Sequence, residues 1–153
     1  MAELKGILVR LKTKRERDAG TDDAIYVGIM GKGGGSEFPL DVRDFDDWEE
    51  GSDVKYWFGD VWEGSALSGA KRPWGATRWN HPGIRYIDLD KVDYVYLRKQ
   101  STKGGRGDDA WKMDEVEVTL YGPSPQKRTF WKTGDIWLGN EYGLWVYLKE
   151  KEE

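Results

Sequence analysis

The sequence contains no cysteine and a single histidine, His81, in 153 residues. The absence of cysteine excludes disulfide bonds and zinc–thiolate sites, but it does not fix the cellular compartment, because many secreted proteins also lack cysteine. With one histidine and no thiol, nucleophilic triads have no support. His81 precedes Pro82 in an expected turn, and we interpret it as a surface residue rather than a catalytic base.

Long apolar runs are also missing from this chain. No segment approaches the roughly 20 apolar residues of a membrane-spanning helix, so any membrane contact is expected to be peripheral. The first residues, MAELKGILVRLKTKRERD, lack the apolar run and the small-residue cleavage site of a secretory signal. The net charge of -4, from 28 acidic and 24 basic residues, argues against nucleic acid as a partner.

Aromatic residues are abundant, with nine Trp and eight Tyr in a chain of only 38% hydrophobic residues. Some of these rings are expected in the core, and their number favours an exposed cluster as well.

Alternation of apolar and polar residues dominates the chain, and no window shows a helical face. Strands are expected at 5–13, 24–31, 53–59, 92–100, 114–122, 126–133 and 142–150, with an eighth at 84–90. Short strands separated by Gly, Asp, Pro and Ser clusters predict one antiparallel β-sandwich domain over residues 1–153.

Two strands illustrate which residues should face the core. In the first strand the inward set is Ile7, Val9 and Leu11. In the last strand the inward set is either Leu144, Val146 and Leu148 or the complementary Trp145 and Tyr147, and the pattern leaves both open.

Aspartates gather in three loops: DAGTDD at 18–23, GDDAW at 107–111 and DVRDFDDWEE at 41–50. Like charges this close repel unless a cation lies between them, and calcium takes about six to eight oxygen ligands from carboxylates and carbonyls. The first two loops precede or open expected strands, so a sandwich can collect them at one end and form a joint oxygen cage. The alternative is that each loop is a solvated acidic turn.

A long connection at about 60–83 is rich in tryptophan and basic residues. A loop of this length is usually functional or mobile. Tryptophan prefers the bilayer interface and basic residues favour anionic headgroups. Alternatives are that the rings stack on sugars, or that the loop folds back and its rings plug the rim of the sandwich. The candidate contacts with a membrane or ligand are Trp62, Trp74, Trp79, Lys71 and Arg72.

Several stretches together resemble a known family. GILVRLKTKRERDAGTDDAIYVGIMG, then DFDDWEEGSDVKYWF, then DYVYLRKQ leading into GDDAWKMDEVEV, resemble a PLAT (polycystin, lipoxygenase, alpha-toxin) domain. The resemblance is closest to the calcium-dependent membrane-binding C-terminal domain of clostridial alpha-toxin phospholipases. It implies an eight-stranded antiparallel β-sandwich of two four-stranded sheets, calcium (Ca²⁺) as the bound ion, and a phospholipid membrane surface as partner. It further implies a peripheral membrane or secreted protein.

The resemblance also implies ligands by position. The best calcium site would use the carboxylates of Asp18 and Asp109 and the carbonyls of Gly20 and Ala110. Thr21 and Asp22 would lie near a neighbouring ion.

Further calcium contacts are implied from Asp41 and Asp47. This loop departs from the family pattern, because it is one residue longer and Val42 stands where a side-chain oxygen is expected. The segment 60–83 is an insertion of roughly twenty residues relative to the toxin domain. The toxin's catalytic domain has no counterpart here, so we expect a non-enzymatic module. A protein or glycan partner, with calcium only structural, is the alternative function.

Overall fold

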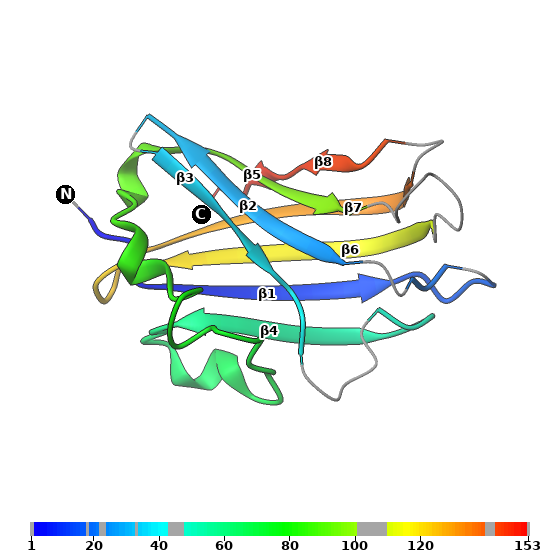
Figure 1. Ribbon diagram of the computed structural model, residues 1–153, viewed down its shortest axis with the longest axis horizontal. Coiled ribbons are helices and arrows are strands. Elements are labelled where there is room, and N and C mark those ends of the chain that lie inside the picture. The colour runs from blue at the N-terminus through cyan, green and yellow to red at the C-terminus, as the bar shows by residue number, and fades with distance from the viewer. Residues whose placement is uncertain are drawn as a thin grey trace.

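The structure, a computed structural model, describes residues 2–17, 19–21, 24–32, 34–42, 48–100, 110–139 and 143–152. Strands dominate these residues and form two antiparallel sheets that pack face to face (Figure 1). The five-stranded sheet has the order β4 (Asp53–Gly59), β1 (Gly6–Thr13), β6 (Trp111–Tyr121), β7 (Lys127–Leu138) and β9 (Lys149–Glu150). The four-stranded sheet has the order β3 (Gly34–Pro39), β2 (Ile25–Gly31), β5 (Val92–Lys99) and β8 (Trp145–Tyr147).

The expected fold class, an antiparallel β-sandwich, is confirmed. The larger sheet has five strands rather than four because the two-residue strand β9 pairs with β7. Within the described ranges, the only helical segments are the short 3₁₀ turns η1 (Gly64–Leu67), η2 (Pro82–Arg85) and η3 (Leu89–Lys91). None of these helices has the length and apolarity that crossing a bilayer would require.

The prediction of a strand at 84–90 was wrong. Residues there form η2 and η3, and two side chains stabilise these turns. His81 Nδ1 accepts a hydrogen bond from the Gly83 amide at 2.9 Å, and Asp88 accepts one from the Asp90 amide at 3.0 Å. Local side-chain bonds of this kind compete with strand pairing, so the alternating pattern did not produce a strand.

The core lies between the sheets and follows the alternation of the strands. Ile7, Val9 and Leu11 of β1 are buried, as predicted. At the C-terminal end, Val146 and Leu148 point inward while Trp145 and Tyr147 are more than half exposed. Of the two inward sets that the sequence left open for the last strand, the aliphatic one faces the core, with Leu144 partly buried.

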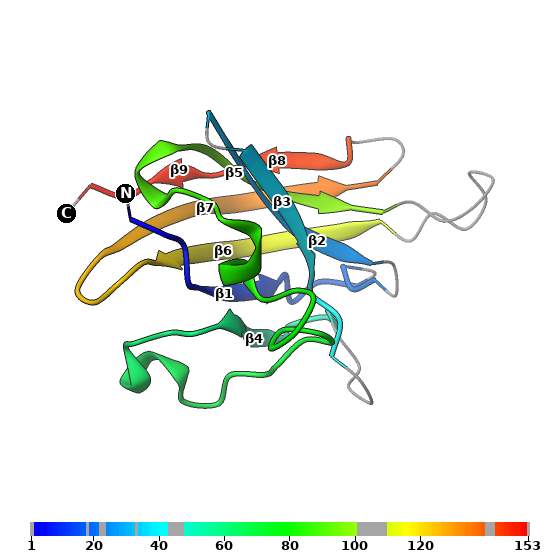
Figure 2. The same cartoon turned by 60° about the vertical axis from the view of Figure 1, so that its left-hand side comes forward.

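The segment 60–83, expected from the sequence to be an insertion and called the insertion below, folds back along β4, the edge strand of the five-stranded sheet (Figure 2). Lys71 donates its amide to Lys55 O at 2.8 Å and its carbonyl accepts the amide of Trp57 at 3.0 Å. The Gly59 amide donates to Ala76 O at 2.9 Å. An exposed strand edge is a site for unwanted pairing, and this insertion covers part of it.

A tight contact links β2 to β5 on the outer face of the smaller sheet. Gly28 pairs with Tyr96, whose ring lies directly over the glycine. A Cβ atom placed on Gly28 would lie only 2.0 Å from Cζ of Tyr96. The ring can occupy this position only because residue 28 has no side chain.

We expect Gly28→Ala to lower the free energy of unfolding by about 1–3 kcal/mol, because the added methyl group must displace the Tyr96 ring. Urea denaturation measures the change. Gly64→Ala is the matched control, since nothing lies within 4 Å of a Cβ built there. Equal stability of the Gly28→Ala variant and the native protein would contradict the contact.

Candidate metal centre and aromatic surfaces

One end of the sandwich gathers the described residues that border the acidic loops. β1 ends at this end, and β4 and β6 begin there (Figure 1). The amide of Lys112 donates to Ala19 O at 2.9 Å, which joins the start of β6 to the segment after β1. The amide of Thr21 donates to Trp48 O at 3.2 Å, which joins the same segment to the residues before β4. Main-chain hydrogen bonds therefore hold three distant stretches of chain together here.

The implied calcium ligands divide into described and undescribed residues. Asp18, Asp22, Asp47 and Asp109 lie outside the described residues. The described members are Gly20, Thr21, Asp41 and Ala110, of which Thr21 is buried and Asp41 is exposed.

Gly20 packs closely against the chain before β4. A Cβ at Gly20 would lie 3.0 Å from both the Glu50 amide nitrogen and the Trp48 carbonyl oxygen. Its backbone therefore approaches the neighbouring loop more closely than a residue with a side chain could without displacing that loop.

The donor chemistry at this end fits calcium, which prefers hard oxygen ligands from carboxylates and backbone carbonyls. Gly20 and Ala110 could each offer a carbonyl, and the sequence contributes no thiolate. Among the described residues alone, no group of three or more acidic or histidine side chains forms a metal cluster. The carboxylates implied as ligands belong mostly to residues outside that set.

Two lysine side chains at this end are paired with carboxylates. Lys14 lies 3.0 Å from Asp135 and 4.0 Å from Asp114, and Lys112 forms an ion pair with Glu16. The hydrogen bond from Lys14 lowers the pKa of Asp135 below its ordinary value.

Lys99 is a residue that the sequence analysis did not single out. It ends β5 at this same end of the sandwich, faces inward, and is completely buried. Buried ammonium groups occur almost only with polar or anionic partners. The sequence signal for its burial is that Lys99 falls on the inward-facing side of the expected strand 92–100.

The five expected membrane contacts of the insertion do not form a single cluster. Trp62 packs edge-on against Tyr121 with ring centroids 5.5 Å apart, and its Nε1 donates to Gln126 O at 3.2 Å. Tyr121 ends β6, so Trp62 lies at the end of the sandwich opposite the acidic loops (Figure 1). Trp62 is therefore held against this end of the sandwich, with 37% of the residue still exposed.

Trp74 and Trp79 form a separate, half-exposed pair with ring centroids 6.2 Å apart. The amide of Trp74 donates to the carbonyl of Asp41 at 2.7 Å, so this pair borders the third acidic loop.

The two basic candidates in the insertion have different surroundings. Lys71 is exposed and bridges to β4 through its backbone. Arg72 stacks over the ring of Trp57 at 3.2 Å, and its partial burial lowers its pKa. Arg72 therefore acts mainly as packing for the insertion.

A second aromatic surface lies on the outer face of the four-stranded sheet. Tyr94 and Tyr96 of β5 and Trp145 and Tyr147 of β8 form what we call the aromatic shelf. All but Tyr96 are more than half exposed. An exposed aromatic cluster was expected in the segment 60–83 rather than here. The sequence signal for the aromatic shelf is the aromatic residues at alternate positions of both strands.

A bidentate ion pair borders the aromatic shelf. Arg98 donates two hydrogen bonds to Glu37, both at 2.9 Å, and Tyr96 donates its hydroxyl to the same carboxylate at 2.9 Å. The hydrogen bond from Arg98 holds the pKa of Glu37 below its ordinary value, despite partial burial. Burial, together with the bond to Glu37, raises the pKa of Tyr96 to about 12.

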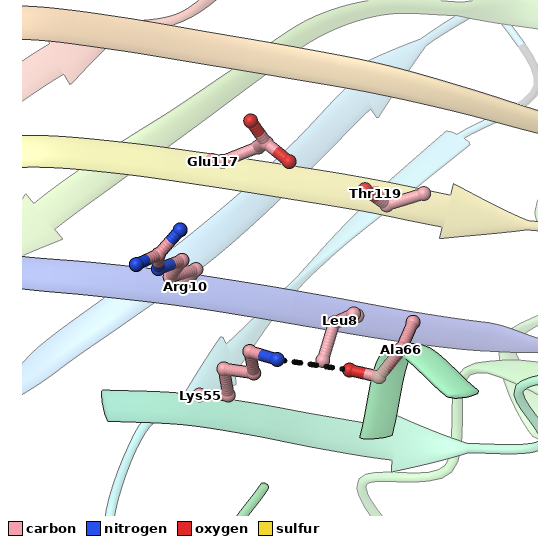
Figure 3. Close-up of a pocket in the computed structure, with 6 residues that line it drawn as sticks. All are labelled: Leu8, Arg10, Lys55, Ala66, Glu117 and Thr119. Carbon is pink, nitrogen blue, oxygen red and sulfur yellow. Dashed lines mark hydrogen bonds between the residues drawn. The ribbon is translucent and has the colours of Figure 1, made fainter. Parts of the chain in front are cut away.

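A polar hollow of about 190 Å³ lies on the outer face of the five-stranded sheet (Figure 3). Lys55 donates to Ala66 O at 3.3 Å, so the insertion closes one side of it. Arg10 is paired with Asp53, and Glu117 with Lys151. Its charged side chains are therefore already satisfied by protein partners. The hollow is lined by Leu8, Arg10, Lys55, Ala66, Glu117 and Thr119.

Comparison with known families assigns this fold. The PLAT/LH2 domain model matches residues 7–145, which is most of the chain. The chain belongs to the PLAT/LH2 domain family. This confirms the resemblance drawn from the sequence.

Solved structures share the same fold. Alpha-toxin from Clostridium absonum is 21% identical with a TM-score of 0.64, and the match covers 97% of this chain and 32% of the toxin. Coral 8R-lipoxygenase is 19% identical with a TM-score of 0.59, covering 96% of this chain and 17% of the enzyme. The PLAT chain thus spans a third or less of these proteins. No curated protein matches it by sequence.

The Glu37–Arg98 pair predicts a pH dependence of stability. Because the pKa of Glu37 is lower in the folded state than the ordinary value of 4.5, the pair stabilises the fold above that pH. The contribution is lost as pH falls through the lowered pKa. We expect Glu37→Gln to reduce the thermal unfolding midpoint at pH 7, and the difference from the native protein to shrink below pH 4.5.

Thermal unfolding followed by circular dichroism from pH 7 to pH 3 measures this effect. Glu152→Gln, in the exposed tail, is the control with the same change in charge. A difference between Glu37→Gln and the native protein that is constant across the pH range would contradict the assignment.

Proposed function

We propose that this PLAT domain is a non-enzymatic module that binds phospholipid membranes in a calcium-dependent manner. The observation that carries the proposal is the set of main-chain hydrogen bonds that joins Ala19 to Lys112 and Thr21 to Trp48. These bonds bring together the described residues that flank all three acidic loops.

The proposed ligands are those that the family resemblance implies, and the arrangement of the described residues supports them. Calcium, when bound, would supply positive charge between acidic loops and lipid phosphates. This matters because the chain carries a net charge of -4 and would otherwise be repelled by an anionic membrane. The residues proposed to hold the ion or ions are Asp18, Gly20, Thr21, Asp22, Asp109, Ala110, Asp41 and Asp47.

Two neighbours in fold support a role for calcium. The coral 8R-lipoxygenase is described as activated by calcium through a C2-like domain. An 11R-lipoxygenase, 16% identical with a TM-score of 0.52, is described as calcium-dependent, and the match covers 95% of this chain and 17% of the enzyme.

The insertion would contribute the interfacial aromatic residues. Trp74 and Trp79 are half exposed, and the amide of Trp74 is bonded to Asp41. Of the rings in this segment, this pair is the best placed to enter a membrane surface beside the proposed calcium site. Lys71 is exposed next to them in sequence and could meet anionic headgroups. Trp62 is anchored at the other end, so a membrane role for it would require a different docking face.

We expect Asp18→Asn and Asp109→Asn each to weaken calcium binding by roughly tenfold or more, because each removes a charged ligand from a site tuned by ligand charge. Isothermal titration calorimetry of the native protein and both variants measures this. Asp90→Asn, an exposed aspartate in η3, is the matched control. Unchanged calcium affinity in both variants would show that Asp18 and Asp109 are not calcium ligands.

We expect the native protein to pellet with phosphatidylserine-containing liposomes in calcium and to stay in solution with excess chelator. Trp74→Ala and Trp79→Ala should reduce pelleting by several-fold, because interfacial rings contribute to partitioning. Trp62→Ala should pellet like the native protein. If pelleting is calcium-dependent but insensitive to Trp74 and Trp79, the calcium site stands and the proposed membrane contact of these two rings fails.

A further inference from the structure

The aromatic shelf is a continuous row of rings. The centroids of Tyr94 and Tyr147 are 5.9 Å apart, those of Tyr147 and Tyr96 are 6.3 Å apart, and those of Tyr96 and Trp145 are 5.0 Å apart. The rings are tilted to one another by 46° to 76°. They form a twisted strip rather than a flat plate.

Polar groups with fixed positions extend the strip beyond Trp145. The guanidinium of Arg98 lies 5.8 Å from the Trp145 ring and 4.4 Å from the Tyr26 ring. Arg98 also donates to Gln100 Oε1 at 2.6 Å and to the Glu37 carboxylate. Donors and acceptors at this border are therefore held in place before any ligand arrives, which lowers the entropic cost of binding.

The rings are held in place by the sheet. Tyr96 sits over Gly28, and its hydroxyl is bonded to Glu37. Tyr147 pairs with Tyr96, and Trp145 with Arg98, in the register of β5 and β8. The strip is built on strands rather than on loops, so its geometry is fixed by the fold.

The charges around the aromatic shelf indicate which class of ligand it could bind. Glu37 and Arg98, the charged side chains that contact the shelf, neutralise one another. A polyanion would find no unpaired cation among these contacts and would meet a protein of net charge -4. The electrostatic match is with an uncharged ligand.

We propose that the aromatic shelf binds an uncharged glycan chain, with sugar rings stacked on Tyr94, Tyr147 and Trp145. One face of a pyranose ring presents C–H groups that pack on aromatic rings, while its hydroxyls form hydrogen bonds at the edges. The shelf offers both features, in a row that suits successive sugars of an extended chain. This site uses residues other than the proposed calcium ligands and does not depend on calcium.

Other occupants fit the shelf less well. A lipid surface is best entered by projecting apolar loops, whereas these rings lie on a sheet face and carry three phenolic hydroxyls. A second copy of the chain would bury few aliphatic side chains at this surface. Met30 is the one exposed, large, non-aromatic hydrophobic residue on β2, β5 or β8.

The test is calorimetry of the full chain, in chelator, with four uncharged hexasaccharides: cellohexaose, xylohexaose, mannohexaose and maltohexaose. We expect at least one to bind. Trp145→Ala and Tyr147→Ala should each weaken that binding by about tenfold or more, as the loss of an anchoring ring does at interfaces. Tyr147→Phe, which keeps the ring, should retain most of the affinity. Trp74→Ala removes an equally exposed tryptophan elsewhere and should bind like the native protein.

Three results would overturn this proposal. The first is no binding of any of the four sugars by the folded native protein. The second is sugar binding that survives Trp145→Ala and Tyr147→Ala but fails in Trp74→Ala. The third is a Trp145-dependent dimer in light scattering, or calcium-independent, Trp145-dependent binding to phosphatidylcholine vesicles, since either would give the shelf another occupant. Because chelator is present throughout, failure here is separate from failure of the calcium proposal.

Discussion

Two main-chain hydrogen bonds, from Lys112 to Ala19 and from Thr21 to Trp48, hold three distant parts of the chain at one end of the sandwich. Everything proposed for the acidic loops depends on this constraint, because the proposed calcium ligands come from separate loops. These hydrogen bonds join main-chain atoms, so they do not depend on which side chains the loops carry. They let the loops vary in charge and length while the strands beneath them keep their register.

The insertion at 60–83 combines two physical roles. Its backbone covers the β4 edge through Lys71 and Ala76, which protects an otherwise open strand. Its tryptophan side chains lie at separate positions. Trp62 packs against Tyr121, while Trp74 and Trp79 are half exposed and the amide of Trp74 is bonded to Asp41. An element that secures the fold can thereby also present a ring pair next to the proposed ion site.

Much of the fold could be predicted from the sequence, because burial in a sandwich follows strict alternation. Ile7, Val9 and Leu11 were placed correctly on that basis. The strand β3 was missed because its glycines and Pro39 are poor strand formers, and 84–90 was misassigned because His81 and Asp88 cap local turns. The aromatic shelf was missed because period-two alternation says which residues share a face, but pairing of β5 with β8 is what brings Tyr96 and Tyr147 together.

Amide NMR spectra recorded during a calcium titration report whether calcium binds where the acidic loops begin. If it does, the amide signals of Gly20, Thr21 and Ala110 move in a saturable way, while those of Tyr94 and Tyr147 on the outer sheet face stay fixed. If Gly20, Thr21 and Ala110 do not respond to millimolar calcium, calcium does not bind at this end of the sandwich.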